Sequence, residues 1–204
     1  MSDFKLAKKV QLVQMKEEYA TKMGFDKAFN KNEGRPFLYI GKVNNVDIYA
    51  PLYSIKPKDY KPNGKLRISP DNIQKLFNEK NQVLGKLELS YCVPIPKKET
   101  IKIDFNSSFF KKNKEKRSRL FSEIRYIKRN LDIITDKFNV LYHEKINENG
   151  YPNNKYLKHT NDYDALIEKS LELTNTKRVE KQQNTMISKI EDIRFDLETL
   201  IINN

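Results

Sequence analysis

Residues 35–58 read RPFLYIGKVNNVDIYAPLYSIKPK, and this stretch decides the fold. Two runs rich in β-branched and aromatic residues, 37–43 and 47–52, flank the pair Asn44-Asn45. Asparagine tolerates the left-handed backbone that a tight two-residue turn needs, so the stretch predicts a β-hairpin. Pro57 and Pro62 fix φ and lack a backbone donor, and they predict an irregular segment over 54–62 after the hairpin.

Shorter elements are expected around this hairpin. Alternation of apolar and polar residues predicts strands over 9–15 and 86–94. In the second of these, Leu87, Leu89, Tyr91 and Val93 share one face, and Cys92 lies on the other as a small packing residue. Helices are expected over 17–29 and, opened by Ser69, over 70–78, with a loop over 30–34.

The strongest periodic pattern lies downstream of these elements. Apolar residues recur at alternating spacings of four and three over 120–141, which predicts one long amphipathic helix. The stripe consists of Leu120, Ile124, Ile127, Leu131, Ile134, Phe138 and Leu141. Arg125 and Arg129 lie away from it. Two more helical segments are expected after residues 147–154, and the last has an apolar face that either docks on the domain or meets a partner.

These elements together predict the fold class and the domain organisation. Strands and helices mix without regular βαβ units, and several strand pairs are linked as hairpins. We therefore expect an α+β fold with a strongly twisted antiparallel sheet and surrounding helices, one of them long, basic and amphipathic. The core domain is expected over 1–160, with a C-terminal helical extension over 161–204 packed on it.

Charge points to a polyanionic partner. The net charge is +12, and residues 97–130 alone carry 12 Lys or Arg against 4 Asp or Glu. Each phosphate that such a surface neutralises releases counterions, so nucleic acid is favoured over a merely solvated basic surface. No apolar run has the length of a membrane span, no signal peptide is recognised, and Cys92 is the single cysteine. We expect a cytoplasmic protein with no membrane contact.

The sequence lacks the motifs of several classes of enzyme and so restricts the chemistry that the protein can perform. Carboxylates are scattered, His143 and His159 are the only histidines, and no glycine-rich phosphate loop is present, so neither a metal nor a nucleotide cofactor is expected. A Ser-His-Asp triad is not excluded by spacing, but no serine has the surroundings of a nucleophile elbow. RNA offers its own 2′-hydroxyl as nucleophile, and the protein then supplies positioning, positive charge and proton transfer.

The segment Tyr53-Ser54-Ile55-Lys56 has residue types suited to that chemistry. Its hydroxyls can hydrogen-bond a phosphate, and a spacing of two on extended backbone places Ser54 and Lys56 on the same side. The alternative is an ordinary strand end that runs into a polar loop.

The stretch 35–58 resembles the signature of the ToxN/AbiQ family, the toxins of type III toxin–antitoxin systems. The resemblance rests on the run Ala50-Pro51-Leu52-Tyr53-Ser54-Ile55-Lys56 and on two further blocks in the same order. These are Leu84-Gly85 followed by LELSYCVPIP, and LFSEIRYIKRNLDII over 120–134. The resemblance covers roughly residues 9–145.

The resemblance implies a sheet akin to that of the Kid and MazF toxins. It also implies a metal-independent endoribonuclease that cuts RNA by 2′-hydroxyl attack and leaves 2′,3′-cyclic phosphate and 5′-hydroxyl ends. The implied partners are substrate mRNA and a repeated antitoxin RNA, which folds into pseudoknots and inhibits the toxin in a closed protein–RNA assembly. The implied biological role is phage defence by abortive infection.

Residue roles follow from the matching positions. Ser54 and Lys56 match residues that bind and polarise the scissile phosphate, Tyr53 stands where Thr or Ser is common, and Arg35 matches a basic residue before the hairpin. Some relatives have a tyrosine where this chain has Lys31. We expect RNA contacts from Lys31, Lys58, Lys111, Lys112, Lys114, Lys116, Arg117, Arg119, Arg125, Lys128 and Arg129.

Two other functions remain open at this stage. A non-catalytic RNA-binding protein would use the same basic residues, with Phe109, Phe110 and Tyr126 for base stacking. A DNA-binding regulator is less well supported, because no helix-turn-helix spacing is present. We therefore expect no DNA partner.

Overall fold

The computed structural model describes residues 4–25, 29, 31, 34–64, 72–147 and 157–202. Its centre is the predicted hairpin of β3 (Phe37–Val43) and β4 (Val46–Ser54), which pair antiparallel from Phe37↔Pro51 to Val43↔Val46. Asn44 and Asn45 have φ of 49° and 65°, the left-handed conformation expected of this turn. The hairpin prediction is confirmed.

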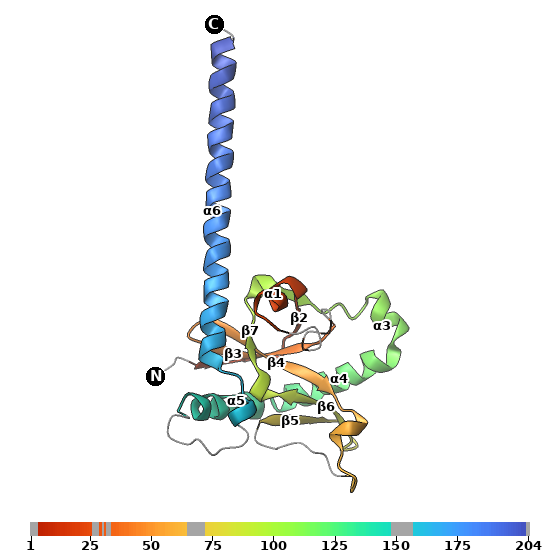
Figure 1. The fold of residues 1–204 in the computed structure, drawn as a ribbon. Helices are drawn as coiled ribbons and strands as arrows, with labels where there is room; N and C mark the ends of the chain where they lie inside the picture. Colours follow the sequence, from red (N-terminus) through yellow and green to blue (C-terminus); the bar gives the residue numbers. More distant parts are fainter. Residues whose placement is uncertain are drawn as a thin grey trace.

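The other strands extend this hairpin into one antiparallel sheet. Along the sheet the order is β5-β6-β4-β3-β2-β8, with β1 on β3 and β7 on β4 (Figure 1). The added strands are β1 (Phe4–Leu6), β2 (Leu12–Met15), β5 (Ile73–Phe77), β6 (Val83–Glu88), β7 (Val93–Pro94) and β8 (Thr100–Lys102). Together with the helices they confirm an α+β fold.

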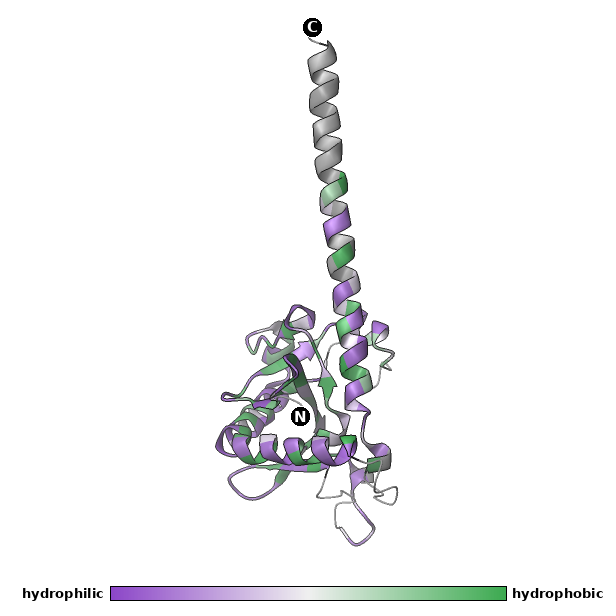
Figure 2. Cartoon of the chain, turned by 90° about the vertical axis from the view of Figure 1, so that its left-hand side faces the viewer, coloured by the Kyte–Doolittle hydropathy of each residue, from purple (hydrophilic) through white to green (hydrophobic). Residues whose placement is uncertain are grey.

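Among the described residues, one helix lies between strands in sequence, and the longer helices follow the last strand. One short helix, α1 (Glu17–Lys22), follows β2, and α3 (Ser108–Lys112), α4 (Lys114–Arg129), α5 (Leu131–Ile146) and α6 (Tyr163–Ile202) follow the last strand. Single 3₁₀ turns are η1 (Pro57–Asp59), η2 (Leu89–Tyr91), η3 (Lys97–Glu99) and η5 (Leu157–His159). In Figure 2 the strands of the body are largely hydrophobic, whereas the helices carry both kinds of residue.

Two N-terminal predictions were too long. The strand expected over 9–15 is β2, which begins at Leu12. The helix expected over 17–29 ends at Lys22, because Gly24 takes the left-handed conformation, with φ of 78°. Glycine adopts that conformation at no steric cost, and it terminates helices for this reason.

The helix expected over 70–78 is wrong. Residues 73–77 form β5, which pairs antiparallel with β6 from Ile73↔Glu88 to Phe77↔Val83. Leu76 is fully buried on one face of this strand. Pairing with a strand ten residues further on supplies the backbone hydrogen bonds here, and it overrides the weak local preference for a helix.

The continuous strand expected over 86–94 is also wrong. Residues 83–88 pair with the end of β4, and residues 93–94 pair with its middle at Ile48 and Tyr49. The turn η2 joins the two short strands and lets the chain skip part of β4. Cys92 is fully buried, as expected of a packing residue, and burial raises the pKa of its thiol.

The single helix expected over 120–141 is two helices. The chain breaks at Asn130, whose amide side chain donates to the Tyr126 carbonyl and whose own carbonyl accepts the first bond of α5. The apolar stripe itself is correct, because it continues across the break into the core. Leu120, Ile127, Leu131, Ile134, Phe138 and Leu141 are all buried, and Ile124 packs partly against them.

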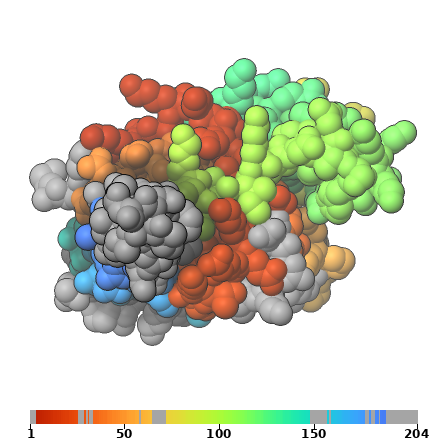
Figure 3. Space-filling model, turned by 90° about the horizontal axis from the view of Figure 1, so that it is seen from above, coloured from red at the N-terminus to blue at the C-terminus, as the bar shows by residue number. Residues whose placement is uncertain are grey.

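The C-terminal segment is one helix rather than two. The first turns of α6 pack on the body, where Tyr163, Ile167 and Ser170 are buried, and the Tyr163 hydroxyl donates to the Leu89 carbonyl. Beyond these turns α6 runs away from the body (Figure 1). Seen from above, the described part of α6, in blue, lies on the opposite side of the molecule from α3, in yellow-green (Figure 3). None of the described helices has the length and apolar character needed to cross a bilayer.

Candidate active site

Ser54 is the last residue of β4, and it lies where helix α4 crosses the end of the sheet. It pairs with Gly85 of β6, and Tyr53 pairs with Lys86. From α4, the Nη2 atom of Arg119 donates a hydrogen bond to Ser54 Oγ at 2.9 Å. The sequence predicted Ser54 as a catalytic residue and Arg119 as an RNA contact, but it did not predict that the two contact each other.

Lys56 follows on backbone that is still extended, with φ of −117° and ψ of 156°. Its N–H donates to Asp59 Oδ2 at 2.7 Å. The same carboxylate lies 3.7 Å from Lys86 Nζ, which in turn lies 2.6 Å from Glu88 Oε1. This chain of polar contacts ties the backbone of Lys56 to β6 and leaves its side chain exposed.

Positive charges from three segments act on one another near Arg119, the residue that contacts Ser54. The pKa of Lys31 is lowered first by desolvation and then by the charges of Arg35, Lys56, Lys116 and Arg119. The pKa of Lys116 is also lowered, by desolvation and by Arg119. We call these five residues the cationic cluster. Like charges this close repel one another, and an anion that binds among them relieves the repulsion.

Arg35, the buried member of the cluster, stacks on the ring of Tyr53. The Arg35 guanidinium carbon lies 3.7 Å from the centre of the Tyr53 ring, and Lys86 Nζ lies 5.7 Å from it. Arg35 is only 3% exposed, and its guanidinium donates to the carbonyls of Leu52 and Phe29. Contacts of this kind hold the ring of Tyr53 in one orientation.

Glu123 is a buried carboxyl near the site that the sequence did not single out. Its Oε1 lies 3.7 Å from Arg119 Nε, one helical turn away, and its side chain is 4% exposed. Burial raises its pKa from 4.5 to about 7, and the charge of Arg119 opposes that rise. The spacing of four between Arg119 and Glu123 was the available sequence signal, but such pairs are common on exposed helices.

Gly85 makes room for this carboxyl group. A Cβ atom at residue 85 would lie 2.5 Å from Glu123 Oε1 and 2.9 Å from the Tyr53 carbonyl oxygen. Any side chain here therefore displaces Glu123 or the end of β4. The space taken by Glu123 and by the end of β4 thus explains why a glycine stands at residue 85, which the sequence pattern alone did not show.

The remaining predicted RNA contacts lie along α3 and α4. Lys111, Lys112, Lys114 and Lys128 are exposed. Arg125 and Arg129 lie 3.8 Å and 4.0 Å from the Glu79 carboxylate, all of them well exposed. Arg117 lies over the Phe121 ring at 5.5 Å and donates to Asn106. The side chain of Lys58 lies outside the described residues.

Acidic and sulfur-bearing side chains do not gather into a metal site in the part of the chain that the structure describes. No three His, Cys, Asp or Glu side chains there are arranged so as to hold a metal ion. The chemically notable groups of the site are a serine hydroxyl, lysine and arginine cations, and one buried carboxyl.

Comparisons with known proteins agree on one family. Residues 10–195 match the family described as toxin ToxN of type III toxin–antitoxin systems. Endoribonuclease ToxN of Bacillus thuringiensis subsp. kurstaki is 27% identical over 130 residues, 62% of each chain. The match thus spans less than two thirds of that relative's length.

Solved structures share the fold. One, from work on selective toxin inhibition by a non-coding RNA pseudoknot in type III systems, has a TM-score of 0.65 at 22% identity and covers 81% of this chain and 98% of its own. A second, AbiQ, a lactococcal anti-phage endoribonuclease of a type III system, has a TM-score of 0.60 at 21% identity and covers 82% and 99%.

Proposed function

This chain belongs to the ToxN toxin family of type III toxin–antitoxin systems, and from that premise we propose that it is a metal-independent endoribonuclease with Ser54 and Lys56 at its active site. The observation that carries the proposal is the hydrogen bond from Arg119 to Ser54 inside the cationic cluster. A hydroxyl held by an arginine that belongs to a group of mutually repelling cations is an arrangement that binds a phosphodiester.

The proposed reaction uses the 2′-hydroxyl of RNA as its nucleophile. The 2′-oxygen forms a bond to the adjacent phosphorus, the bond from phosphorus to the 5′-oxygen breaks, and 2′,3′-cyclic phosphate and 5′-hydroxyl ends result. The five-coordinate intermediate carries more negative charge than the substrate. Positive side chains fixed around it stabilise that charge selectively, and this selectivity accelerates the reaction.

We assign roles within the site as follows. Ser54 accepts from Arg119, so its own proton is available to a phosphate oxygen, and Lys56 and Arg119 stabilise the developing charge. We propose that one neutral lysine of the cationic cluster takes the proton from the 2′-hydroxyl and that a second, protonated lysine of the cluster gives a proton to the departing 5′-oxygen. The lowered pKa values of Lys31 and Lys116 make the neutral form more accessible in them than in an ordinary lysine. Arg35 is buried, and it positions the ring of Tyr53 rather than reaching the RNA itself.

The family also suggests the partner and the biological role. We propose that a repeated antitoxin RNA, folded into pseudoknots, occupies the cationic cluster and closes a protein–RNA assembly. The substrate would be mRNA, and release of the toxin would stop phage propagation by abortive infection. The exposed lysines of α3 and α4 fit such a polyanion through counterion release, and a Kid/MazF-like core is part of the same proposal.

Growth inhibition by the expressed full chain tests the assignment of the site. Lys56→Ala removes an exposed side chain, so the fold should be kept while toxicity is lost. Lys61→Ala is the matched control, because Lys61 is an exposed lysine outside the cationic cluster. Toxicity lost equally in both variants, or retained in Lys56→Ala, contradicts the assignment.

A further inference from the structure

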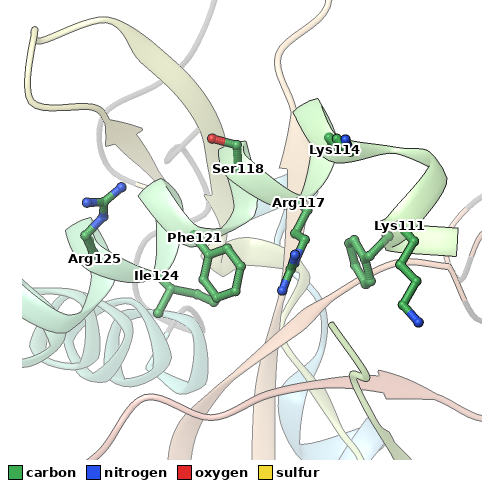
Figure 4. Close-up of a pocket in the computed structure, with 8 residues that line it drawn as sticks. Lys111, Lys114, Arg117, Ser118, Phe121, Ile124 and Arg125 are labelled. Carbon is green, nitrogen blue, oxygen red and sulfur yellow. The ribbon is translucent and has the colours of Figure 1, made fainter. Parts of the chain in front are cut away.

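A groove between α3 and α4 lies apart from the proposed active site at Ser54. It has a volume of about 730 Å³, with Phe110, Phe121 and Ile124 as its apolar lining and with Lys111, Lys114 and Arg117 beside them. In Figure 4 the side chains of Arg117, Phe121 and Ile124 point to the same side of α4. We call this feature the aromatic groove.

The aromatic groove has an exposed ring fixed in place. Phe121 is 39% exposed, and its other face stacks on Phe105 with ring centres 4.8 Å apart. Phe105 in turn packs against Phe110, with ring centres 5.4 Å apart. The Arg117 guanidinium carbon lies over the same ring, 5.5 Å from its centre. A ring that is supported by Phe105 and partly open to solvent beside a guanidinium offers an aromatic surface at little entropic cost.

The charges around the groove indicate what would cover that ring. Among the described lining residues four are cationic and none is acidic. An apolar protein segment would gain nothing from this excess of positive charge. A nucleotide matches both features, because its base stacks on an aromatic ring and its phosphate pairs with lysine and arginine.

The aromatic groove is continuous with the surface next to the proposed active site. A neighbouring hollow is lined by Lys112, Lys116 and Arg119, with Glu115 as the one acidic residue of its described lining, and it shares Lys114 and Ser118 with the aromatic groove. Arg119 is the residue that holds Ser54. A strand of RNA with one phosphate at Ser54 therefore has a cationic path across the N-terminal half of α4.

We propose that the aromatic groove binds an unpaired nucleobase of an RNA strand that also occupies the cationic cluster. The ligand class is single-stranded RNA, because a base within a duplex is already stacked and cannot lay its face on Phe121. The proposal takes RNA as ligand from the proposed function, but it does not require cleavage.

Binding measurements with the full chain test this proposal. All proteins carry Lys56→Ala so that the RNA stays intact, and the probes are a fluorescein-labelled mixed-sequence 12-nucleotide RNA and the same RNA annealed to its complement. Phe121→Leu removes the aromatic face, and Phe121→Tyr keeps it as the matched control. We expect Phe121→Leu to weaken single-strand binding by about tenfold and Phe121→Tyr to leave it unchanged. Duplex binding should be the same for all three.

Equal single-strand affinity in the Leu and Tyr variants overturns the proposal, as does an equal loss for the duplex. Photocrosslinking provides a second measurement, of which peptides contact the RNA, and it needs no substitution at Phe121. RNA with 4-thiouridine at each position in turn should crosslink to the peptide that contains Phe121, and crosslinks confined to other peptides also overturn the proposal. Failure of the parent chain to cut RNA would count against the proposed function alone, since neither measurement depends on cleavage.

Discussion

Arg119 on α4 donates a hydrogen bond to Ser54 at the end of β4 across 2.9 Å, although 65 residues separate them in sequence. Of the three blocks that carry the family resemblance, the contact joins the one with the Ala-Pro-Leu run to the helix on which another begins one residue later, at Leu120. One guanidinium reaches Ser54 through Nη2 while its Nε lies beside Glu123. A planar fork is needed to do both, and lysine has no such fork.

The first prediction concerns the guanidinium group of Arg119. Arg119→Lys keeps the charge but cannot hold Ser54 and Glu123 together, so single-turnover RNA cleavage should fall about 100-fold, the usual cost of removing one charge-stabilising donor. RNA affinity should change little. Arg129→Lys, an exposed arginine on the same helix, is the control and should cut at the parent rate. A parent-like cleavage rate in Arg119→Lys would show that the arginine fork has no role in cleavage.

The second prediction concerns pH and Glu123. Its pKa is about 7 in the fold against 4.5 ordinarily, so between these pH values the native state holds a proton that the unfolded chain has released. This group therefore stabilises the fold at pH below about 4.5 and loses that contribution as pH rises to 7, by up to about 3 kcal/mol.

Urea unfolding of the parent and of Glu123→Gln at pH 5 and pH 8 measures this contribution. As pH rises from 5 to 8, the parent should lose stability relative to Glu123→Gln, because glutamine does not titrate. A pH-independent difference contradicts the raised pKa.

The third prediction concerns Gly85. In Gly85→Ala the new methyl group meets Glu123 Oε1 and the Tyr53 carbonyl, so the unfolding free energy should fall by about 2 kcal/mol, and cleavage should fall with it. Adding Glu123→Ala removes one of the two clashes and should restore part of the stability. A double variant no more stable than Gly85→Ala would show that Glu123 is not the obstacle.

The fourth prediction separates the ring of Tyr53 from its hydroxyl. Arg35 and Lys86 both lie over the ring, so Tyr53→Phe should keep cleavage within a few-fold of the parent rate, whereas Tyr53→Ala should lose most of it. Cleavage rates and thermal unfolding of both variants supply the test. An equal loss in both assigns a chemical role to the hydroxyl instead.

Local patterns carried the parts of the fold that were predicted correctly. The hairpin of β3 and β4 depends on Asn44-Asn45 and on alternation within a few residues, and both are visible in the sequence. Residues 73–77 were predicted as helix because their pairing with β6 is not a local property. The break at Asn130 was missed because the apolar stripe continues across it unchanged.

In the site, too, local motifs were visible in the sequence, whereas contacts between distant segments were not. Ser54 and Lys56 were predicted from a short motif, and Arg119 donates to Ser54 while Lys56 belongs to the cationic cluster. The contact of Arg119 with Ser54, the burial of Glu123 and the space left by Gly85 arise where α4 crosses the sheet. Residue types and spacing carry no information about such a crossing, so the sequence assigned Arg119 only to general RNA contact.

RNA cleavage by the purified full chain in the presence of EDTA tests the central claim most directly. The account predicts fragments with 2′,3′-cyclic phosphate and 5′-hydroxyl ends, no cut where a single 2′-deoxynucleotide replaces the scissile one, and no cleavage by Lys56→Ala. Cleavage abolished by EDTA and restored by magnesium, or fragments with 5′-phosphate ends, would contradict it.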